Sequence, residues 1–262
     1  MGVSVFVVGH RGMLGTTVRR YLDEVGHTVL TTDLRFTGRA GDPLIEQVGR
    51  SDAEVIVNCA GAIPSRAATE AEMLLSNALL PLQLGTRLGE GRLFIHASTD
   101  GVFSGNRGHY SVDDRPDATD AYGLSKRVGE FVIHLTHAVV IRTSIVGTGG
   151  GLLRWLMEQH SDVRGYTDHF WNGVTTAEWA RVCAEMIERR KSLAPGIVHL
   201  TSRETISKFE LLDAAAHIFG SPIRVLPATS GRPVNRVLVP TIERGRITQQ
   251  LATLRQWERG GP

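Results

Sequence analysis

The chain has 262 residues, of which 29 are Lys or Arg and 27 are Asp or Glu, giving a formal net charge of +2. This balance does not indicate a nucleic-acid partner or an anionic membrane surface. Hydrophobic residues make up 42% and charged residues 21%, which excludes a disordered or fibrous chain. The two cysteines, Cys59 and Cys183, cannot form a disulfide framework, and no run reaches the ~18 apolar residues of a membrane span. We therefore expect a soluble, cytoplasmic protein with no membrane partner.

The first half of the sequence alternates apolar, β-branched runs with longer helical patterns. Strands are predicted at 3–8, 27–33, 55–57, 93–95 and 138–141. Helices are predicted at 16–25, 69–88 and 121–135. Near-continuous apolar strands separated by helices are typical of a parallel sheet that is covered on both faces. The pattern predicts an α/β fold with a doubly wound parallel sheet, the Rossmann architecture.

From residue 147 onward the pattern changes to helices interrupted by loops. Helices are predicted at 152–159, 176–190 and 207–219, with one buried strand at 196–200. No long Gly/Ser linker separates the two halves. We expect a dinucleotide-binding Rossmann domain over 1–170 and a smaller C-terminal lobe over 171–262, mainly for substrate binding, with 175–200 returning to the Rossmann domain.

A glycine-rich loop follows the first predicted strand. The residues Gly9-His-Arg-Gly12-Met-Leu-Gly15 form a G-x-x-G-x-x-G pattern between a strand and a helix. Glycines let the backbone turn tightly and approach a pyrophosphate, and the helix N-terminus offers free N–H groups and the positive end of its dipole. The loop predicts a dinucleotide site that includes Gly9, Arg11, Gly12, Met13, Leu14 and Gly15.

The segments after the second and third strands leave the choice of dinucleotide open. Asp33, at the end of the second predicted strand, is placed to accept hydrogen bonds from the adenosine ribose, which favours NAD. Arg11 and Arg35 favour the 2′-phosphate of NADP, although a solvated loop charge also explains Arg35. Further contacts are expected from Asp42 to the adenine and, on the ribose side, from Cys59, Ala60 and Gly61. The segments 41–43 and 58–61, which contain these residues, are equally consistent with turns that bind no ligand.

Tyr122 and Lys126 are four residues apart on a predicted helix, so their side chains share one face. A phenol with a pKa near ~10 is a poor acid or base at neutral pH. A nearby ammonium group and a positively charged nicotinamide favour the phenolate and lower that pKa. Such a tyrosine can donate a proton to a carbonyl oxygen as hydride reaches the carbonyl carbon. The pair indicates a nicotinamide-dependent oxidoreductase.

Together with the glycine loop, this pair resembles the extended short-chain dehydrogenase/reductase family, and most closely its nucleotide-sugar reductases of the dTDP-4-dehydrorhamnose reductase type. The segment 96–105, HASTDGVFSG, resembles the family's S-T-D-Y-V-F-x-G stretch. Asn77 with Pro81 resembles its N-x-x-x-P helix. The segments 141–144 and 232–238 resemble its R-T-S and R-P-x-N-S-x-L motifs.

The resemblance implies a role for each matching residue. Tyr122 would be the general acid, Lys126 would hold the nicotinamide ribose and tune the tyrosine, and Thr99 would hydrogen-bond the reacting oxygen. Thr143 would join the cofactor site. The implied substrate contacts are Asp100, Val102, Phe103 and Arg232.

Four further residues are candidates for contacting or shaping the sugar pocket. Trp171 and Asn172 lie where the lobes should meet, and they are candidates for stacking on and hydrogen bonding to the substrate; a Trp packed between the lobes is the alternative. Gly101 stands where the family has a tyrosine, which enlarges or reshapes the pocket. The family's serine is Arg236 here, either a pyrophosphate anchor or a solvated side chain. The residues of dehydratases and of C3/C5 epimerases are missing around Gly101, so neither reaction is expected.

We therefore predict NAD(P)H-dependent reduction of the 4-keto group of a nucleotide-activated deoxysugar, with NADPH and NADH both open. The alternatives are a nucleotide-sugar C4 epimerase that retains NAD and a non-catalytic, NAD(P)-binding regulatory subunit. The ten histidines lack metal-ligand spacing, so no metal is expected. The expected partner is a nucleotide sugar, and a homodimer is one option for the oligomeric state.

Overall fold

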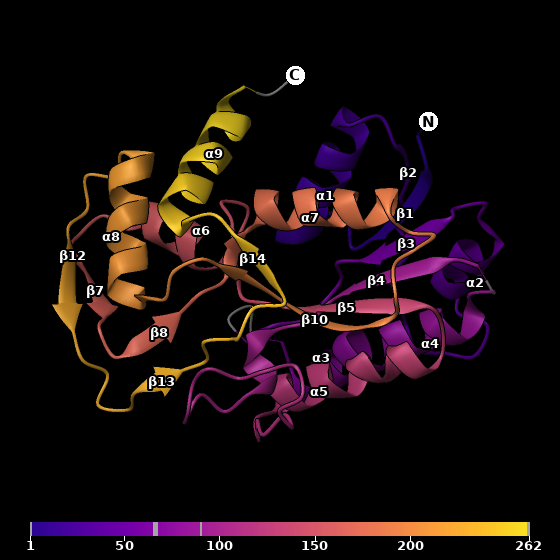
Figure 1. Cartoon of the computed structure of the whole chain (residues 1–262), viewed down its shortest axis with the longest axis horizontal. Coiled ribbons are helices and arrows are strands. Elements are labelled where there is room, and N and C mark those ends of the chain that lie inside the picture. Colours follow the sequence, from indigo (N-terminus) through magenta and orange to yellow (C-terminus); the bar gives the residue numbers. More distant parts are fainter. Residues whose placement is uncertain (1, 65–67, 90, 261–262) are drawn as a thin grey trace.

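The computed structural model describes residues 2–64, 68–89 and 91–260 (Figure 1). Seven strands form one parallel sheet in the order β14-β10-β5-β4-β3-β1-β2. Their bounds are β1 Ser4–Val8, β2 Thr28–Leu30, β3 Val55–Asn58, β4 Leu93–Ala97, β5 Ala138–Arg142, β10 Gly196–Ser202 and β14 Ile242–Arg244. This sheet confirms the predicted α/β fold of Rossmann type.

Helices cover both faces of the sheet (Figure 1). One face carries α1 (Met13–Glu24) and α7 (Thr176–Glu188), and the other carries α2 (Pro43–Arg50), α4 (Leu80–Arg87) and α5 (Ala121–Gly129). Successive side chains of a strand point to opposite faces. Val5 and Val7 of β1 therefore enter the core beneath α1 and α7. Phe6 and Val8 enter the core on the opposite face, with residues of α2 and α4.

Two predicted helices contain irregular segments. The helix predicted over 69–88 consists of α3 (Glu70–Met73), a π-helical segment (Leu74–Leu79) and α4. The helix predicted over 121–135 ends at Gly129 and continues as a 3₁₀ segment, Glu130–His134. A Cβ on Gly129 would lie 2.1 Å from the carbonyl O of Asn77 in the π-helical segment. The two helices therefore touch backbone to backbone, and π-helical turns of this kind are frequent at functional sites.

The second lobe lies at one end of the sheet and has its own core (Figure 1). Its helices are α6 (Gly151–Met157), α8 (Lys208–Phe219) and α9 (Ile247–Arg259). Its short strands are β7 Val163–Tyr166, β8 His169–Trp171, β11 Ile206–Ser207, β12 Val225–Ala228 and β13 Val234–Asn235, and β6 Ile145–Val146 pairs with β9 Val174–Thr175. The core of this lobe includes Val146 and Leu153, well before the boundary expected at 170. The later elements α7, β10 and β14 belong to the main sheet and its covering layer.

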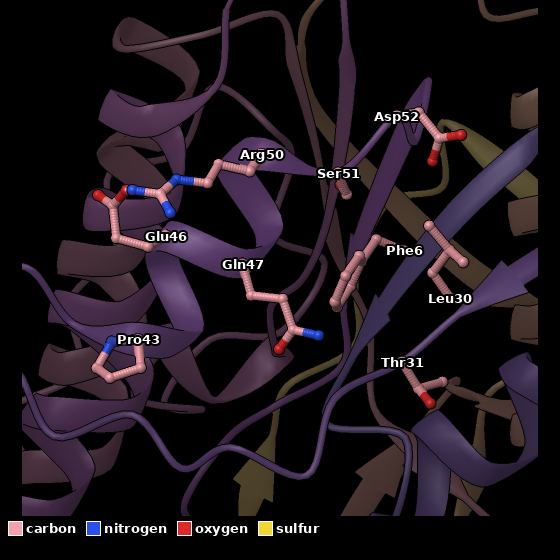
Figure 2. Close-up of a pocket in the computed structure, with 9 residues that line it drawn as sticks. All are labelled: Phe6, Leu30, Thr31, Pro43, Glu46, Gln47, Arg50, Ser51 and Asp52. Atoms are coloured by element: carbon pink, nitrogen blue, oxygen red, sulfur yellow. The ribbon is translucent and has the colours of Figure 1, made fainter.

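No helix in the described part of the chain is long and apolar enough to cross a membrane. Within the same residues, no group of three or more His, Cys, Asp or Glu side chains could hold a metal ion. A cavity of about 750 Å³ lies between the edge strand β2 and α2 (Figure 2). None of the predicted site residues lines it; its lining is Phe6, Leu30, Thr31, Pro43, Glu46, Gln47, Arg50, Ser51 and Asp52.

Candidate active site

The glycine loop joins β1 to α1 and packs against the residues that follow β3. Gly9 has a φ of +81°, which favours glycine, and a Cβ there would lie 2.7 Å from the backbone N of Ala60. A Cβ on Gly15 would lie 2.1 Å from the carbonyl O of Gly9. Both positions therefore require glycine. α1 begins after Gly12 with no side-chain cap among the described residues, so its first N–H groups can bind an anion.

A cavity of about 590 Å³ lies between this loop and the segment that follows β2. Arg11, Asp33, Arg35 and Ala60, all predicted cofactor contacts, line it. Arg11 Nη2 lies 2.5 Å from Asp33 Oδ1, and His10 Nε2 lies 3.5 Å from the same oxygen. The carboxylate that favours NAD is thus paired with the guanidinium that favours NADP, and this geometry leaves both dinucleotides open.

Asp42, predicted to contact the adenine, is instead the N-cap of α2. Its buried carboxylate accepts hydrogen bonds from the backbone N of Leu44 and from the backbone N and hydroxyl of Thr37, at 3.0, 2.8 and 2.8 Å. Burial raises the pKa of this carboxyl group, but the hydrogen bonds outweigh burial and lower it. Asp42 does not line the cavity, because its acceptor positions are used to start the helix.

A second cavity, of about 260 Å³, lies beyond the carboxyl ends of β3, β4 and β5. Ligands of open α/β sheets bind at this edge because the strand ends and helix starts meet there. Gly12 and Ile63 line both cavities, which therefore adjoin at the glycine loop. The predicted residues that line the second cavity are Gly12, Met13, Leu14, Cys59, Gly61, Thr99, Tyr122, Lys126 and Thr143.

Lys126 is buried on α5, and its Nζ donates a hydrogen bond to the carbonyl O of Ala97 at 3.0 Å. A Cβ on Gly61 would lie 3.1 Å from this Nζ, so glycine at 61 keeps space beside the ammonium group. Burial lowers the pKa of Lys126 to about 8, against the opposing effect of the Glu130 and Cys59 side chains. Lys126 can therefore gain or lose its charge near physiological pH.

Tyr122 lies one helical turn before Lys126 and is half-buried. Burial raises its pKa to about 12, with a further upward effect of Asp100, while a hydrogen bond with Thr99 and the charge of Arg236 lower it. This direction is opposite to the lowering expected from Lys126, which is not among these effects. The phenol is protonated at neutral pH, as a proton donor must be.

The segment Thr99-Asp100-Gly101 places a hydroxyl group beside the phenol. Thr99 Oγ1 accepts a hydrogen bond from the backbone N of Gly101 at 3.0 Å and donates one to Asp100 Oδ1 at 3.2 Å. A Cβ on Gly101 would lie 3.1 Å from Tyr122 Cε1 and 3.2 Å from Thr99 Oγ1. A larger residue at 101 would therefore press on the side chains of both Tyr122 and Thr99, unless they moved.

Two basic residues of the second lobe act on the carboxyl group of Asp100. Lys208, at the start of α8, and Arg236, after β13, both lower the pKa of Asp100, which burial raises. The ammonium of Lys208 lies 5.3 Å from the centre of the Trp171 ring. Burial lowers the pKa of Lys208 to about 8. Lys208 was not predicted from the sequence, where its only signal is that it is one of three lysines in the chain.

Three predicted substrate contacts from the family motifs lie away from the cavities. Val102 and Phe103 are fully buried, and the Phe103 ring stacks on Tyr110 with 4.2 Å between centroids. They form a small core because the chain turns inward after Asp100. Arg232 lies in an exposed turn before β13. The arginine near the site is Arg236, whose Nε donates to the carbonyl O of Phe103 at 2.9 Å.

Trp171 and Asn172 also have structural contacts in place of the predicted substrate contacts. Trp171 is 2% exposed within the core of the second lobe. The Asn172 side chain donates to the carbonyl O of Leu238 at 2.8 Å and accepts from its backbone N at 3.1 Å. Trp171 therefore packs inside the second lobe rather than between the lobes, and Asn172 binds the segment that follows β13.

The residues around the two cavities fit a nicotinamide dinucleotide. An uncapped helix N-terminus and a glycine turn stand at the centre, where a pyrophosphate needs N–H donors and close backbone approach. A charged pair stands at one end, and a tyrosine and a lysine at the other. A Rossmann sheet with this loop and this Tyr–Lys pair defines an extended short-chain dehydrogenase/reductase.

Comparison with known families gives the particular family. The chain belongs to the RmlD substrate binding domain family, whose model matches residues 3–258. This match confirms the resemblance predicted from the motifs.

Several relatives match in sequence. The chain is 28% identical over 254 residues to the spore coat polysaccharide biosynthesis protein SpsK of Bacillus subtilis, covering 90% of this chain and 87% of that protein. It is 27% identical over 274 residues to the dTDP-4-dehydrorhamnose reductase of Burkholderia thailandensis, covering 90% of each. It is 32% identical over 169 residues to the methionine adenosyltransferase 2 subunit beta of Danio rerio, covering 56% of this chain and 52% of that protein.

Solved structures share the fold over nearly the whole chain. A dTDP-4-dehydrorhamnose reductase from Clostridium acetobutylicum has a TM-score of 0.84 at 21% identity, covering 98% of this chain and 99% of that chain. The enzyme of the same name from Bacillus anthracis, in complex with NADP, has a TM-score of 0.82 at 20% identity, covering 97% and 99%. At these identities the likeness concerns the fold.

Proposed function

We propose that the protein is an oxidoreductase that uses NADPH or NADH to reduce the 4-keto group of a nucleotide-activated deoxysugar. The observation that carries the proposal is the meeting of Thr99, Tyr122 and Lys126 in one cavity beside the glycine loop. The relative named dTDP-4-dehydrorhamnose reductase supports the nucleotide-sugar class. The neighbour in complex with NADP supports a nicotinamide cofactor.

In the proposed reaction, a bound nicotinamide dinucleotide supplies the hydride. The N–H groups at the start of α1 hold its pyrophosphate, and Lys126 holds the nicotinamide ribose. Tyr122 donates its phenolic proton to the ketone oxygen, and Thr99 orients that oxygen by a hydrogen bond. Because burial raises the pKa of Tyr122 to about 12, the phenol carries its proton before the reaction begins. Asp100, Lys208 and Arg236 present charged groups on the side of the second lobe.

The test is to follow the absorbance of the reduced nicotinamide. The purified chain is mixed with NADPH, or separately with NADH, and with a panel of nucleotide-linked 4-keto-6-deoxysugars. Oxidation of one cofactor with at least one sugar is the expected result. A chain that binds the reduced cofactor, as measured by fluorescence, but oxidises it with no sugar would contradict the proposal.

The match to a methionine adenosyltransferase subunit favours a second candidate function, a non-catalytic NAD(P)-binding subunit of a larger assembly. Such a subunit needs the glycine loop but not Thr99, Tyr122 and Lys126 together. The same absorbance assay separates the candidates, because only the reductase turns over. A C4 epimerase would instead purify with tightly bound NAD and convert a sugar without net oxidation of added cofactor.

Reductase activity should decline as the pH rises through about 8. Burial lowers the pKa of Lys126 to about 8, so its ammonium group is present below that pH and is lost above it. Loss of this charge weakens the charge-assisted hydrogen bond from Lys126 to the ribose in the proposed complex. The profile of kcat/KM between pH 6 and 10 checks this expectation. Constant activity from pH 7 to 10 would contradict the role of Lys126.

We also propose that two copies of the chain associate through the outer face of α5 and the 3₁₀ segment after it. Leu124, Val128, Phe131 and Leu135 follow the helical spacing and are 41–55% exposed. A continuous apolar stripe of this kind marks an interface more often than scattered exposed residues do.

Replacing Phe131 with aspartate should convert the dimer to monomer, because it places a charge in the centre of this stripe. Sedimentation velocity measures the change. The matched control is Leu226→Asp on β12, at a site with 44% exposure outside the stripe, which should leave the dimer intact. A wild-type chain that sediments as a monomer would disprove the association.

A further inference from the structure

A buried ion pair joins Glu130, four residues after Lys126, to Arg142 at the end of β5. Glu130 and Arg142 have side chains that are 5% and 3% exposed. Arg142 donates to both carboxylate oxygens of Glu130, from Nε at 2.9 Å and from Nη2 at 2.8 Å. Ser98 Oγ donates to Glu130 Oε1 at 2.6 Å. A buried carboxylate with three such hydrogen bonds is held in one position.

The position of Glu130 relates it to the site in two ways. Tyr122, Lys126 and Glu130 are spaced by four residues each along α5 and the segment that follows it, so they lie on one face. Lys126 Nζ donates to the carbonyl O of Ala97, and Ser98, the next residue, donates to Glu130. The lysine and the carboxylate are therefore both attached to the end of β4.

The other titratable groups around Lys126 are uncharged at neutral pH. Burial raises the pKa of the Cys59 thiol far above its usual value and lowers that of His96 well below its usual value. Tyr122 is protonated, as described above. The one negative charge among the groups that act on Lys126 is therefore that of Glu130.

The far side of the ion pair carries one further titratable group, His199 of β10. Its Nε2 lies 3.5 Å from Arg142 Nη1. Burial and the charge of Arg142 lower the pKa of His199 to about 4, so it is neutral at physiological pH. The charged groups at Lys126 and at the ion pair are thus Lys126, Glu130 and Arg142 themselves.

We propose that Glu130 is a positioning residue: its carboxylate, held by Ser98 and Arg142, keeps the buried Lys126 ammonium charged and in place, and Arg142 limits the strength of this effect. The proposal rests on the proposed function only for the role of Lys126 in holding the nicotinamide ribose. Glu130, which lies outside the cavity, thus controls the pH range in which Lys126 is charged.

The experiment is a titration of the lysines themselves in the full-length protein. The chain has three lysines, Lys126, Lys191 and Lys208, so a protein labelled with ¹³C at the lysine Cε gives three NMR signals, assigned with Lys191→Arg and Lys208→Arg variants. In Glu130→Gln, the pKa of Lys126 should fall by about one pH unit or more, because a nearby opposite charge is lost. The signals of Lys191 and Lys208 should titrate as in the wild type.

The opposing variant is Arg142→Met. It breaks the same ion pair, but it removes the positive charge and leaves the carboxylate, so the pKa of Lys126 should rise. A purely structural role of the ion pair would move Lys126 in the same direction in both variants. If a single variant does not fold by circular dichroism, the double variant Glu130→Gln/Arg142→Met replaces the pair with uncharged side chains of similar size. In the double variant, the pKa of Lys126 should fall, because the carboxylate of Glu130, which raises this pKa, is gone.

A binding experiment shows the consequence for the site. The affinity for NADPH, measured by fluorescence against pH, should decline at a lower pH in Glu130→Gln than in the wild type. An unchanged Lys126 titration in Glu130→Gln, or shifts of the same sign in both single variants, would overturn the proposal. These measurements need no sugar, so failure of every sugar in the absorbance assay would reject the proposed reductase and leave the conclusion on Glu130 standing.

Discussion

Replacing Tyr122 with phenylalanine should lower kcat by about 100-fold or more, because general acid catalysis contributes ~10²–10⁴-fold. The substitution removes the phenolic oxygen and keeps the ring that fills the space beside Thr99 and Gly101. Binding of NADPH should remain close to that of the wild type, since the glycine loop and Lys126 are unchanged. The measurements are steady-state oxidation of NADPH with the active sugar and fluorescence titration of the cofactor.

The matched control for this loss is Tyr166→Phe. Tyr166 lies on β7 of the second lobe and is 43% exposed, so removal of its hydroxyl should leave kcat unchanged. Wild-type turnover in Tyr122→Phe would exclude the phenol as the proton donor. A loss of both turnover and cofactor binding would instead indicate a change of structure.

Substitutions of Arg11 and Asp33 should change the preference between NADPH and NADH in opposite directions. Arg11→Ala removes a guanidinium that can bind a 2′-phosphate and should lower the NADPH/NADH ratio of kcat/KM by about tenfold. Asp33→Ala removes a carboxylate that repels the phosphate and accepts from the ribose hydroxyls, and it should raise this ratio by about tenfold. The two variants should therefore differ by ~100-fold, because each charge in the pair at present compensates the other.

Arg39→Ala is the control for the charge of this segment. Arg39 is exposed in the same loop and does not line the cavity of about 590 Å³ that Arg11 and Asp33 line, so Arg39→Ala should leave the ratio unchanged. A change of the same sign in Arg11→Ala and Asp33→Ala would show that the pair holds the loop in shape and does not select the dinucleotide.

Local sequence patterns were sufficient to predict features that lie within one element or at the junction of two consecutive elements. The glycine loop could be predicted because Gly9, Gly12 and Gly15 lie between one strand and one helix, in a context with a known physical requirement. Tyr122 and Lys126 could be paired because the period of a helix places residues four apart on one face. The apolar strands predicted the parallel sheet for the same reason, since burial on both faces determines their composition.

Some residues that were predicted to contact a ligand have a packing or capping role in the structure, because burial decides the role. Phe103 and Trp171 are large side chains near the predicted pocket, but both are buried in cores. Asp42 lies before a proline in a pattern typical of a helix start, and the N-cap of α2 uses its carboxylate. The sequence alone does not show whether such a side chain faces a ligand or makes its contacts inside the protein.

The amino-acid sequence by itself determined the fold class, the glycine loop and the Tyr122–Lys126 pair, because each depends on interactions within short segments. Only the tertiary structure decided the charges around that pair. Lys208 comes within the influence of Asp100, and Arg142 binds Glu130, through the packing of separate elements. Electrostatic effects depend on distance and burial in three dimensions, and sequence spacing specifies neither for residues on different elements.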